Sequence, residues 1–237
     1  RDGEYNRGDN LNIPVTAAQT ANQKTEGTAV TFDANTPTTL QLIINQHWYK
    51  AWRLEEFAAN LAYIDQMNFY SEQAGYAIAL AVDDNLAGLP DDFANAEGTL
   101  AVDITDANVR RCLQYLGDAN APEESRVLVV SPAAENNLMG IDKFIHRDYG
   151  TEGAVLKGHI GRIYNLGVYI STNVEGTNAA GHDNTIFQRE AIALAMRKTP
   201  HVKMDASVPH IGNEAVVSVI FGSIETRDDH GTFLRGP

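Results

Sequence analysis

The strongest constraint on the fold is an uninterrupted helical pattern from Glu55 to Leu86. Apolar residues recur along it at helical spacing, with acidic and amide side chains between them. These apolar positions are Phe57, Leu61, Ile64, Met67, Ala74, Ile78 and Ala81. Gly88 and Pro90 end the pattern, and its roughly thirty residues would span about 45 Å. A helix of this length acts as a beam, although Gly75 leaves open an ordinary core helix that is broken there.

The segment before this helix predicts strands that have no core of their own. Apolar and polar residues alternate in two runs, which contain Leu11, Ile13 and Val15, and then Leu40, Leu42 and Ile44. Another strand-like piece, Ala29 to Phe32, follows a polar stretch from Thr16 to Thr28. Because an isolated hairpin is only marginally stable in water, we expect this ribbon to pack on another surface.

The residues after Pro90 predict a second, α/β unit. We expect a helix over Asp103 to Gly117 with Thr105 as its cap, and a second helix from Ser131 and Pro132 to Leu138. The apolar run from Arg126 to Val130 predicts a strand covered on both faces. Together these elements predict a compact sheet with helices packed against it.

The remaining segments are mostly strand-like. Ile160 to Thr172 and Ala215 to Ile224 have strand composition, and the second of them would close the chain. Glu175 to Asn184 predicts a loop, and Ile186 to Met196 is compatible with either helix or strand. No internal repeat is present.

Composition restricts the functions open to the chain. The 237 residues carry a net charge of −13, so contact with nucleic acid is expected to be weak and not sequence-specific. A single cysteine, Cys112, excludes an internal disulfide and zinc sites that need several cysteines. The apolar runs are too short for a membrane span, and no signal peptide is visible.

Motifs of catalysis and cofactor binding are absent from the sequence, which contains no phosphate loop, dinucleotide fingerprint, nucleophile elbow or zinc-binding His-Glu-x-x-His. Three acidic and histidine groups could suggest metal or acid–base sites, but we interpret them as solvated surface: His146 with Asp148, His182 with Asp183, and Asp228, Asp229 with His230. Ser131 is interpreted as a helix start and not as a nucleophile. We therefore predict no catalytic residue, cofactor or metal.

Three local features have both a structural and a functional interpretation. The tripeptide Arg7 to Asp9 matches an integrin-binding motif, but a turn before the first strand is the simpler interpretation. Lys24 could form an amide cross-link with an asparagine of another subunit, or remain a solvated lysine. The aromatic residues from Trp48 to Phe57 could stack on a ligand, but we favour a core at a hinge.

Several stretches follow one another in a characteristic order. They are Gly8 to Pro14; Leu40 to Asn45, leading through Trp48 and Phe57 to Tyr63; Arg126 to Pro132; Gly158 to Ser171, where Ile-Gly-Arg precedes a short apolar strand; and Ile186 to Ala193. In this order they resemble the major capsid proteins of tailed bacteriophages of the Hong Kong ninety-seven type. The resemblance covers most of the chain, although each stretch is short.

The resemblance implies an α+β capsid fold in four parts. An extended β-hairpin loop would occupy 1–46, a peripheral domain with a long spine helix 47–90, and an axial α/β domain 91–185. Residues 186–237 would return mostly to the peripheral sheet and contain the C-terminus. The family's N-terminal arm is not seen, and since the chain opens at Arg1 we expect residues to precede it.

The resemblance also implies a function and a set of contacts. The chain would form pentamers and hexamers of an icosahedral head shell around phage double-stranded DNA, with the loop of each subunit lying on a neighbour's peripheral domain. Candidate inter-subunit contacts are Leu11, Ile13, Val15, Lys24, Phe32, Leu40 and Leu42, and candidate hinge or core residues are Trp48, Trp52, Phe57 and Gly75. Scaffolding, portal and, in some shells, decoration proteins would be partners. The shell would be assembled in the host cytoplasm and end in the virion, without contact with a membrane.

Three other functions remain open. An encapsulin-like bacterial compartment would share the fold but enclose an enzyme. An α/β enzyme would place its site in the loops after Val130 and Tyr169, and the absence of a coherent catalytic set argues against it. A phage decoration or tail protein would fit the early strands but not the long helix.

Overall fold

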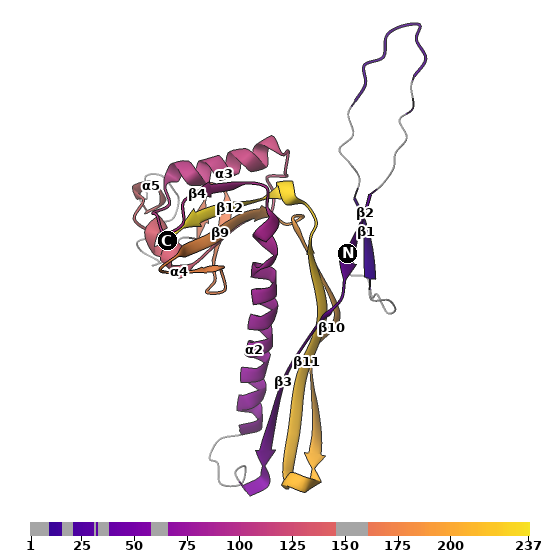
Figure 1. The fold of residues 1–237 in the computed structure, drawn as a ribbon, viewed down its shortest axis with the longest axis vertical. Helices are drawn as coiled ribbons and strands as arrows, with labels where there is room; N and C mark the ends of the chain where they lie inside the picture. The colour runs from indigo at the N-terminus through magenta and orange to yellow at the C-terminus, as the bar shows by residue number, and fades with distance from the viewer. Residues whose placement is uncertain (1–9, 16–20, 31, 33–37, 58–65, 146–160) are drawn as a thin grey trace.

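The computed structural model describes residues 10–15, 21–30, 32, 38–57, 66–145 and 161–237, and it has three parts (Figure 1). A long three-stranded sheet lies beside the helix α2. A compact α/β unit sits at one end of that helix. A two-stranded hairpin leads away from both. The mixed α+β architecture that the sequence predicts is confirmed.

The three-stranded sheet is antiparallel and has the order β10-β11-β3. Its strands are β3 (Gln46–Glu55), β10 (Ile192–Ser207) and β11 (Gly212–Glu225). The sequence did not predict β3, because its apolar and polar residues do not alternate as they do in a half-buried strand. The central strand β11 is not the closing strand of the chain, since a further strand follows it.

Helix α2 (Gln66–Ala87) packs along this sheet and confirms the beam-like helix in its described part. Ala74, Ile78 and Val82 lie four residues apart on one face, where they contact a row of buried side chains of β11. The row consists of Val217, Val219 and Phe221. The helix runs through Gly75 without a break, so the broken-helix alternative is wrong. The expected start at Glu55 is also wrong, because that residue ends β3.

The α/β unit contains a seven-stranded sheet with the order β4-β12-β9-β5-β7-β6, and β8 pairs with β9 beside this path. The strands are β4 (Ala96–Gly98), β5 (Arg126–Val130), β6 (Arg162–Ile163), β7 (Leu166–Ile170), β8 (Gly176–Thr177), β9 (Gly181–Gln188) and β12 (Gly231–Gly236). β5 and β7 are parallel, as are β12 and β4. The loop expected over 175–184 is therefore wrong in part, because it contains β8 and the start of β9.

The helices of this unit cover one face of the sheet. They are α3 (Asp106–Asp118), α4 (Pro132–Leu138) and the short α5 (Asp142–Ile145). Both helix starts that the sequence predicts are confirmed, because the side chain of Thr105 accepts a hydrogen bond from the backbone N–H of Asn108 and that of Ser131 from Ala134. Val109, Cys112 and Leu116 of α3 are fully buried in the main core.

The other face of the seven-stranded sheet is covered only in part: Phe93, Ala191 and Phe233 form a small buried cluster there, but the part at β5 is hollow. Leu128 and Val130 point into the main core, whereas Val127 and Val129 are only half-buried. A hollow of about 650 Å³ lies on their side, between the end of α2 and the sheet, and its apolar lining includes Leu86 and Phe187. The expectation that the strand over 126–130 is covered on both faces is therefore wrong, since Val127 and Val129 remain only half-buried beside this hollow.

The last strand, β12, corrects the expected course of the C-terminal part. It lies between β4 and β9 in the seven-stranded sheet, pairing Leu234 with Asn184. Within the segment 186–237, β10 and β11 join β3 in the three-stranded sheet, as expected for most of this segment, but residues 231–236 do not. The chain thus crosses from the α/β unit to the long sheet and back. The domain limits at 46, 90 and 185 remain a prediction.

Three short 3₁₀ turns complete the described elements: η1 (Leu89–Asp92), η3 (Val208–His210) and η4 (Asp228–His230). No helix in the described residues is long and apolar enough to cross a lipid bilayer.

Candidate assembly surface

The hairpin of β1 (Asn10–Val15) and β2 (Thr38–Ile43) has one apolar and one polar face. Leu11 pairs with Leu42 and Ile13 with Leu40, and residues directly opposite each other in a hairpin lie on the same face. The other face is mostly polar and exposed: it carries Asn10, Asn12, Thr39 and Gln41, together with Pro14 and, at its base, Ile43. Figure 1 shows the hairpin leading away from the other elements, with 21–30 at its far end. On this apolar face Leu42 is buried, whereas Leu11, Ile13, Val15 and Leu40 are half-buried and keep accessible surface.

Among the described residues, the base of the hairpin packs on the body of its own chain. At Gly222 of β11, an added Cβ would lie 2.3 Å from the carbonyl oxygen of Ile43, so β11 and the end of β2 approach at backbone distance. Leu42, next to Ile43, is 1 % exposed. The expectation that Leu42 contacts another subunit is therefore wrong, because its side chain is already buried within the single chain.

The other expected contact residues keep accessible surface. Leu11, Ile13, Val15 and Leu40 are half-buried, while Lys24 and Phe32 are exposed. Phe32 is 95 % exposed, an unusual state for a phenylalanine in a folded chain. The strand expected over 29–32 is wrong at Ala29, Val30 and Phe32, which have no regular structure. Whether these residues touch a neighbouring subunit stays a prediction.

The aromatic residues expected at a hinge do not form one core. Trp52 is half-buried and packs against the cluster between α2 and β11. Trp48, on the edge strand β3, is 44 % exposed, and the helical residue Phe57 is 77 % exposed. The core interpretation is thus wrong for Trp48, which the edge of the three-stranded sheet leaves beside solvent, and for Phe57, which lies beyond the end of β3. Gly75 lies within α2 and has open space where a Cβ would be.

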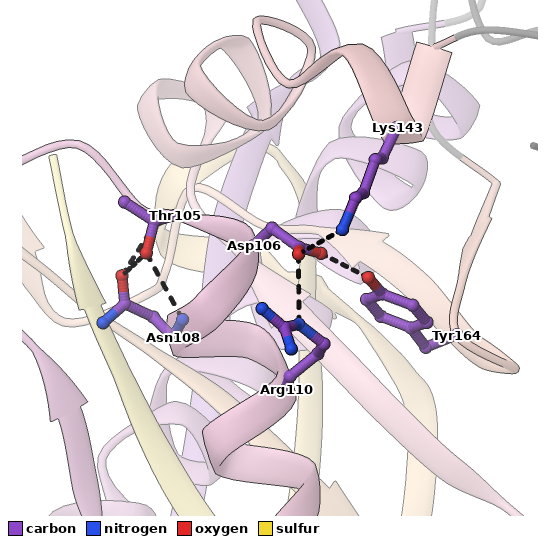
Figure 2. Close-up of polar contacts among 6 residues, drawn as sticks. All are labelled: Thr105, Asp106, Asn108, Arg110, Lys143 and Tyr164. Atoms are coloured by element: carbon purple, nitrogen blue, oxygen red, sulfur yellow. Dashed lines mark hydrogen bonds and ion pairs between the residues drawn. The ribbon is translucent and has the colours of Figure 1, made fainter.

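A carboxylate that the sequence did not single out joins three elements of the α/β unit (Figure 2). Asp106, the first residue of α3, accepts hydrogen bonds from Lys143 of α5 at 2.7 Å and from Arg110 at 3.0 Å. The hydroxyl of Tyr164, in the turn between β6 and β7, also donates to it. An aspartate just after a Thr cap is a sequence signal of a helix start, but no local signal indicates Lys143 or Tyr164.

The charge state of Asp106 follows from these partners. Burial raises the pKa of its carboxyl, but the hydrogen bonds from Lys143 and Tyr164 and the positive charges of Lys143 and Arg110 outweigh burial and lower the pKa overall. Burial, together with the hydrogen bond to Asp106, raises the pKa of Tyr164. The cluster is therefore an ionised anchor that holds α5 and the β6–β7 turn on α3.

The residues considered for catalysis or metal binding have structural contacts. Ser131 is fully buried, and its hydroxyl caps α4. Asp183 forms an ion pair with Arg235 at 3.0 Å, and His182 contacts Asn178. Asp228 accepts from the backbone N–H of Ala94. Within the described ranges no three His, Cys, Asp or Glu side chains are grouped as a metal site would require.

Two of the sequence features considered above lie outside the described residues. They are the Arg7 to Asp9 tripeptide and the pair His146 and Asp148. The turn between β10 and β11, in contrast, is described and carries exposed apolar side chains that the sequence interpretation missed. Its Pro209 and Gly212 are ordinary turn signals that could have located it.

No protein-family model and no curated sequence matches the chain. Solved structures do match it. A chain from Mycobacterium phage Che8 has 20 % sequence identity and a TM-score of 0.80, over 97 % of this chain and 85 % of that one. A chain of the capsid structure of the cyanophage P-SCSP1u has 18 % identity and a TM-score of 0.75, over 98 % and 84 %. A chain of the bacteriophage PhiM1 mature capsid has 13 % identity and a TM-score of 0.74, over 96 % and 82 %.

The match extends over nearly the whole chain, so it includes the hairpin, the long helix with its sheet, and the α/β unit together. At sequence identities of 20 % or less, these matches show that the elements are arranged in the same way, but they do not assign roles to single residues. The chain therefore has the fold of phage capsid proteins of the Hong Kong ninety-seven type.

Proposed function

We propose that the chain is a major capsid protein, which assembles with copies of itself into pentamers and hexamers of an icosahedral shell around phage double-stranded DNA. The observation that carries this proposal is the hairpin, which leads away from the body of the chain and keeps accessible apolar surface at the half-buried Leu11, Ile13 and Leu40. A surface of this kind needs a second molecule. In a shell of identical subunits, the neighbour supplies it through a heterologous contact.

The proposed contact places the hairpin of one subunit on the long sheet and helix of its neighbour. Several large apolar side chains of β10 remain accessible there: Leu194, Met196, Val202 and Met204. Because apolar surface is exposed on both partners, the contact would be stabilised mainly by its removal from water. The role is structural, and the buried or paired state of Ser131 and Asp183 argues against catalysis at these residues.

The proposal extends to partners and location. Scaffolding, portal and, in some shells, decoration proteins would act with the subunit during assembly in the host cytoplasm, and the shell would end in the virion. The net charge of −13 would repel the phosphates of packed DNA, so that the DNA would not adhere to the inner surface of the shell. Contact with the genome would then be weak and independent of sequence.

Electron microscopy of the expressed chain in negative stain tests the proposal. Closed shells or rings of subunits are expected, whereas a stable monomer under all assembly conditions would contradict it. The content of shells purified from cells separates the two related functions. Double-stranded DNA indicates a phage head, and an enclosed enzyme indicates an encapsulin-like compartment.

A further inference from the structure

The hollow beside β5 is enclosed by walls from separate parts of the fold. The seven-stranded sheet forms one wall, the end of α2 a second, and the start of β10 a third. Its volume of about 650 Å³ falls within the range of about 300–1,000 Å³ that is typical of small-molecule sites. Most of its lining is apolar: Leu86, Val127, Val129, Tyr169, Phe187 and Ile192.

The hollow is elongated along β9. Alternate residues of this strand face it, from Asp183 through Thr185 and Phe187 to Arg189, which follows the strand directly. At about 3.3 Å per residue, these positions extend over about 20 Å. One end of the hollow therefore carries a guanidinium group, and the other end carries a carboxylate.

The end at Asp183 contains further acidic groups. A hydrogen bond of 3.3 Å from the side chain of Asn173 to the backbone carbonyl of Leu80 joins the turn after β7 to α2. Glu175 of this turn and Asp83, which stands three residues after Leu80, both line the hollow. Asp183 already takes part in an ion pair, so Asp83 and Glu175 add two carboxylates beyond that pair. An apolar recess with an acidic end is the result.

We propose that the hollow binds a small organic cation with an apolar body and one ammonium group. The body lies on Val127, Val129 and Phe187, where its removal from water stabilises the complex. The ammonium group lies at the end of Asp83 and Glu175, and an anion of the same shape would be repelled there. Tyr169 and Phe187 add aromatic rings, whose faces attract cations.

The dimensions of the hollow favour a small molecule over a protein as its occupant. A stable contact between two proteins buries roughly 800 Å² on each partner. A recess of about 650 Å³ admits only a few side chains of a partner, whereas it encloses most of a small molecule. The inference goes beyond the proposed shell function and does not depend on it, because residues of one chain form the whole hollow.

Two probes of similar shape and opposite charge test the inference on the unassembled full chain. They are phenylbutylamine, a cation at neutral pH, and phenylbutyrate, an anion. The rise of the thermal unfolding midpoint with probe concentration gives each dissociation constant. Asp83→Asn removes a carboxylate from the lining, and Asp84→Asn is its matched control, since Asp84 is also exposed on α2 but does not line the hollow. Val129→Trp fills the hollow from the side of the sheet.

Phenylbutylamine is expected to raise the midpoint by about 3 °C at about ten times its dissociation constant, and phenylbutyrate to leave the midpoint unchanged. Asp83→Asn should weaken binding of the amine about threefold, as loss of one exposed charge pair would. Asp84→Asn should bind the amine like the unaltered chain, and Val129→Trp should not bind it.

Equal shifts from the two probes would overturn the inference, and so would no shift from the amine at concentrations up to about 10 mM. Equal affinities of Asp83→Asn and Asp84→Asn would also refute it, and this comparison decides if Val129→Trp does not fold. Retained binding by a folded Val129→Trp would place the amine elsewhere on the chain. Self-association of the unaltered chain that Val129→Trp abolishes would identify a second copy as the occupant, against the inference.

Discussion

The side chain of Asn184 accepts a hydrogen bond from the backbone N–H of Ser131 at 2.8 Å, in the fully buried centre of the α/β unit. The amide group of Asn184 donates in turn to the carbonyl oxygens of Leu234 at 3.1 Å and His182 at 3.4 Å. One polar side chain thus joins the end of β5 to β9 and to the last strand, β12. All its hydrogen-bonding groups have partners, which is the condition for burying an amide without loss of stability.

Replacing Asn184 with leucine should lower the free energy of unfolding by about 2–4 kcal/mol, because the N–H of Ser131 would remain buried without a partner and the hydrogen bond to the carbonyl of Leu234 would be lost. Urea unfolding followed by circular dichroism measures this change. The exposed Asn12→Leu serves as the control and should change the unfolding free energy by less than about 0.5 kcal/mol. Equal effects of the two substitutions would show that the buried network contributes little.

The hairpin offers a matched pair of neighbouring residues for testing assembly. Ile13→Asp places a charge on the apolar face, whereas Asn12→Asp places the same charge on the polar face. Ile13→Asp should abolish shells, because a buried unpaired carboxylate is strongly unfavourable, and Asn12→Asp should leave most of them. Light scattering during assembly gives the readout, and far-ultraviolet circular dichroism should show both subunits folded. Equal shell yields from the two variants would exclude the apolar face as a contact.

Cys112 should be chemically inert in the folded chain. Its side chain is fully buried, and burial raises the pKa of the thiol to about 12, so almost no thiolate is present at neutral pH. Labelling by a maleimide should be negligible under native conditions and complete in guanidinium chloride. As a control, Gln114→Cys in the Cys112→Ser background puts an exposed thiol on the same helix, and it should react at once. Fast labelling of Cys112 in the native chain would mean that α3 opens readily.

The ion pairs and hydrogen bonds of Asp106 predict that the free energy of unfolding depends on pH in the acidic range. Because the folded-state pKa of Asp106 lies below its ordinary value of 3.8, its stabilising contribution is present above that value and is lost as the pH falls through the folded-state pKa. Asp106→Asn should therefore cost about 1 kcal/mol at pH 7 and progressively less below about pH 4. Chemical unfolding of both proteins between pH 3 and 7 tests this. A difference that does not change with pH would indicate that the charge of Asp106 is unimportant.

Local signals in the sequence account for much of the fold. Thr105 and Ser131 start helices because the side-chain oxygen of each accepts a hydrogen bond from the backbone N–H three residues later. This contact is local, so it does not depend on the fold of the rest of the chain. The alternation of Leu11, Ile13 and Val15 indicates a strand with one apolar face for the same local reason. The aromatic residues of β3 were misinterpreted because burial depends on what covers an edge strand, and the sequence does not contain that information.

The sequence by itself determined the long helix, the amphipathic hairpin and the capped helices of the α/β unit, since each depends on residues only a few positions apart. Only the tertiary structure decided that β12 enters the seven-stranded sheet, that Asp106 meets Lys143 and Tyr164, which lie 37 and 58 residues away, and that Leu86 and Phe187 line the same hollow. Such contacts join distant segments, and any of several pairings would satisfy the same local patterns. The packing of the whole chain selects among them.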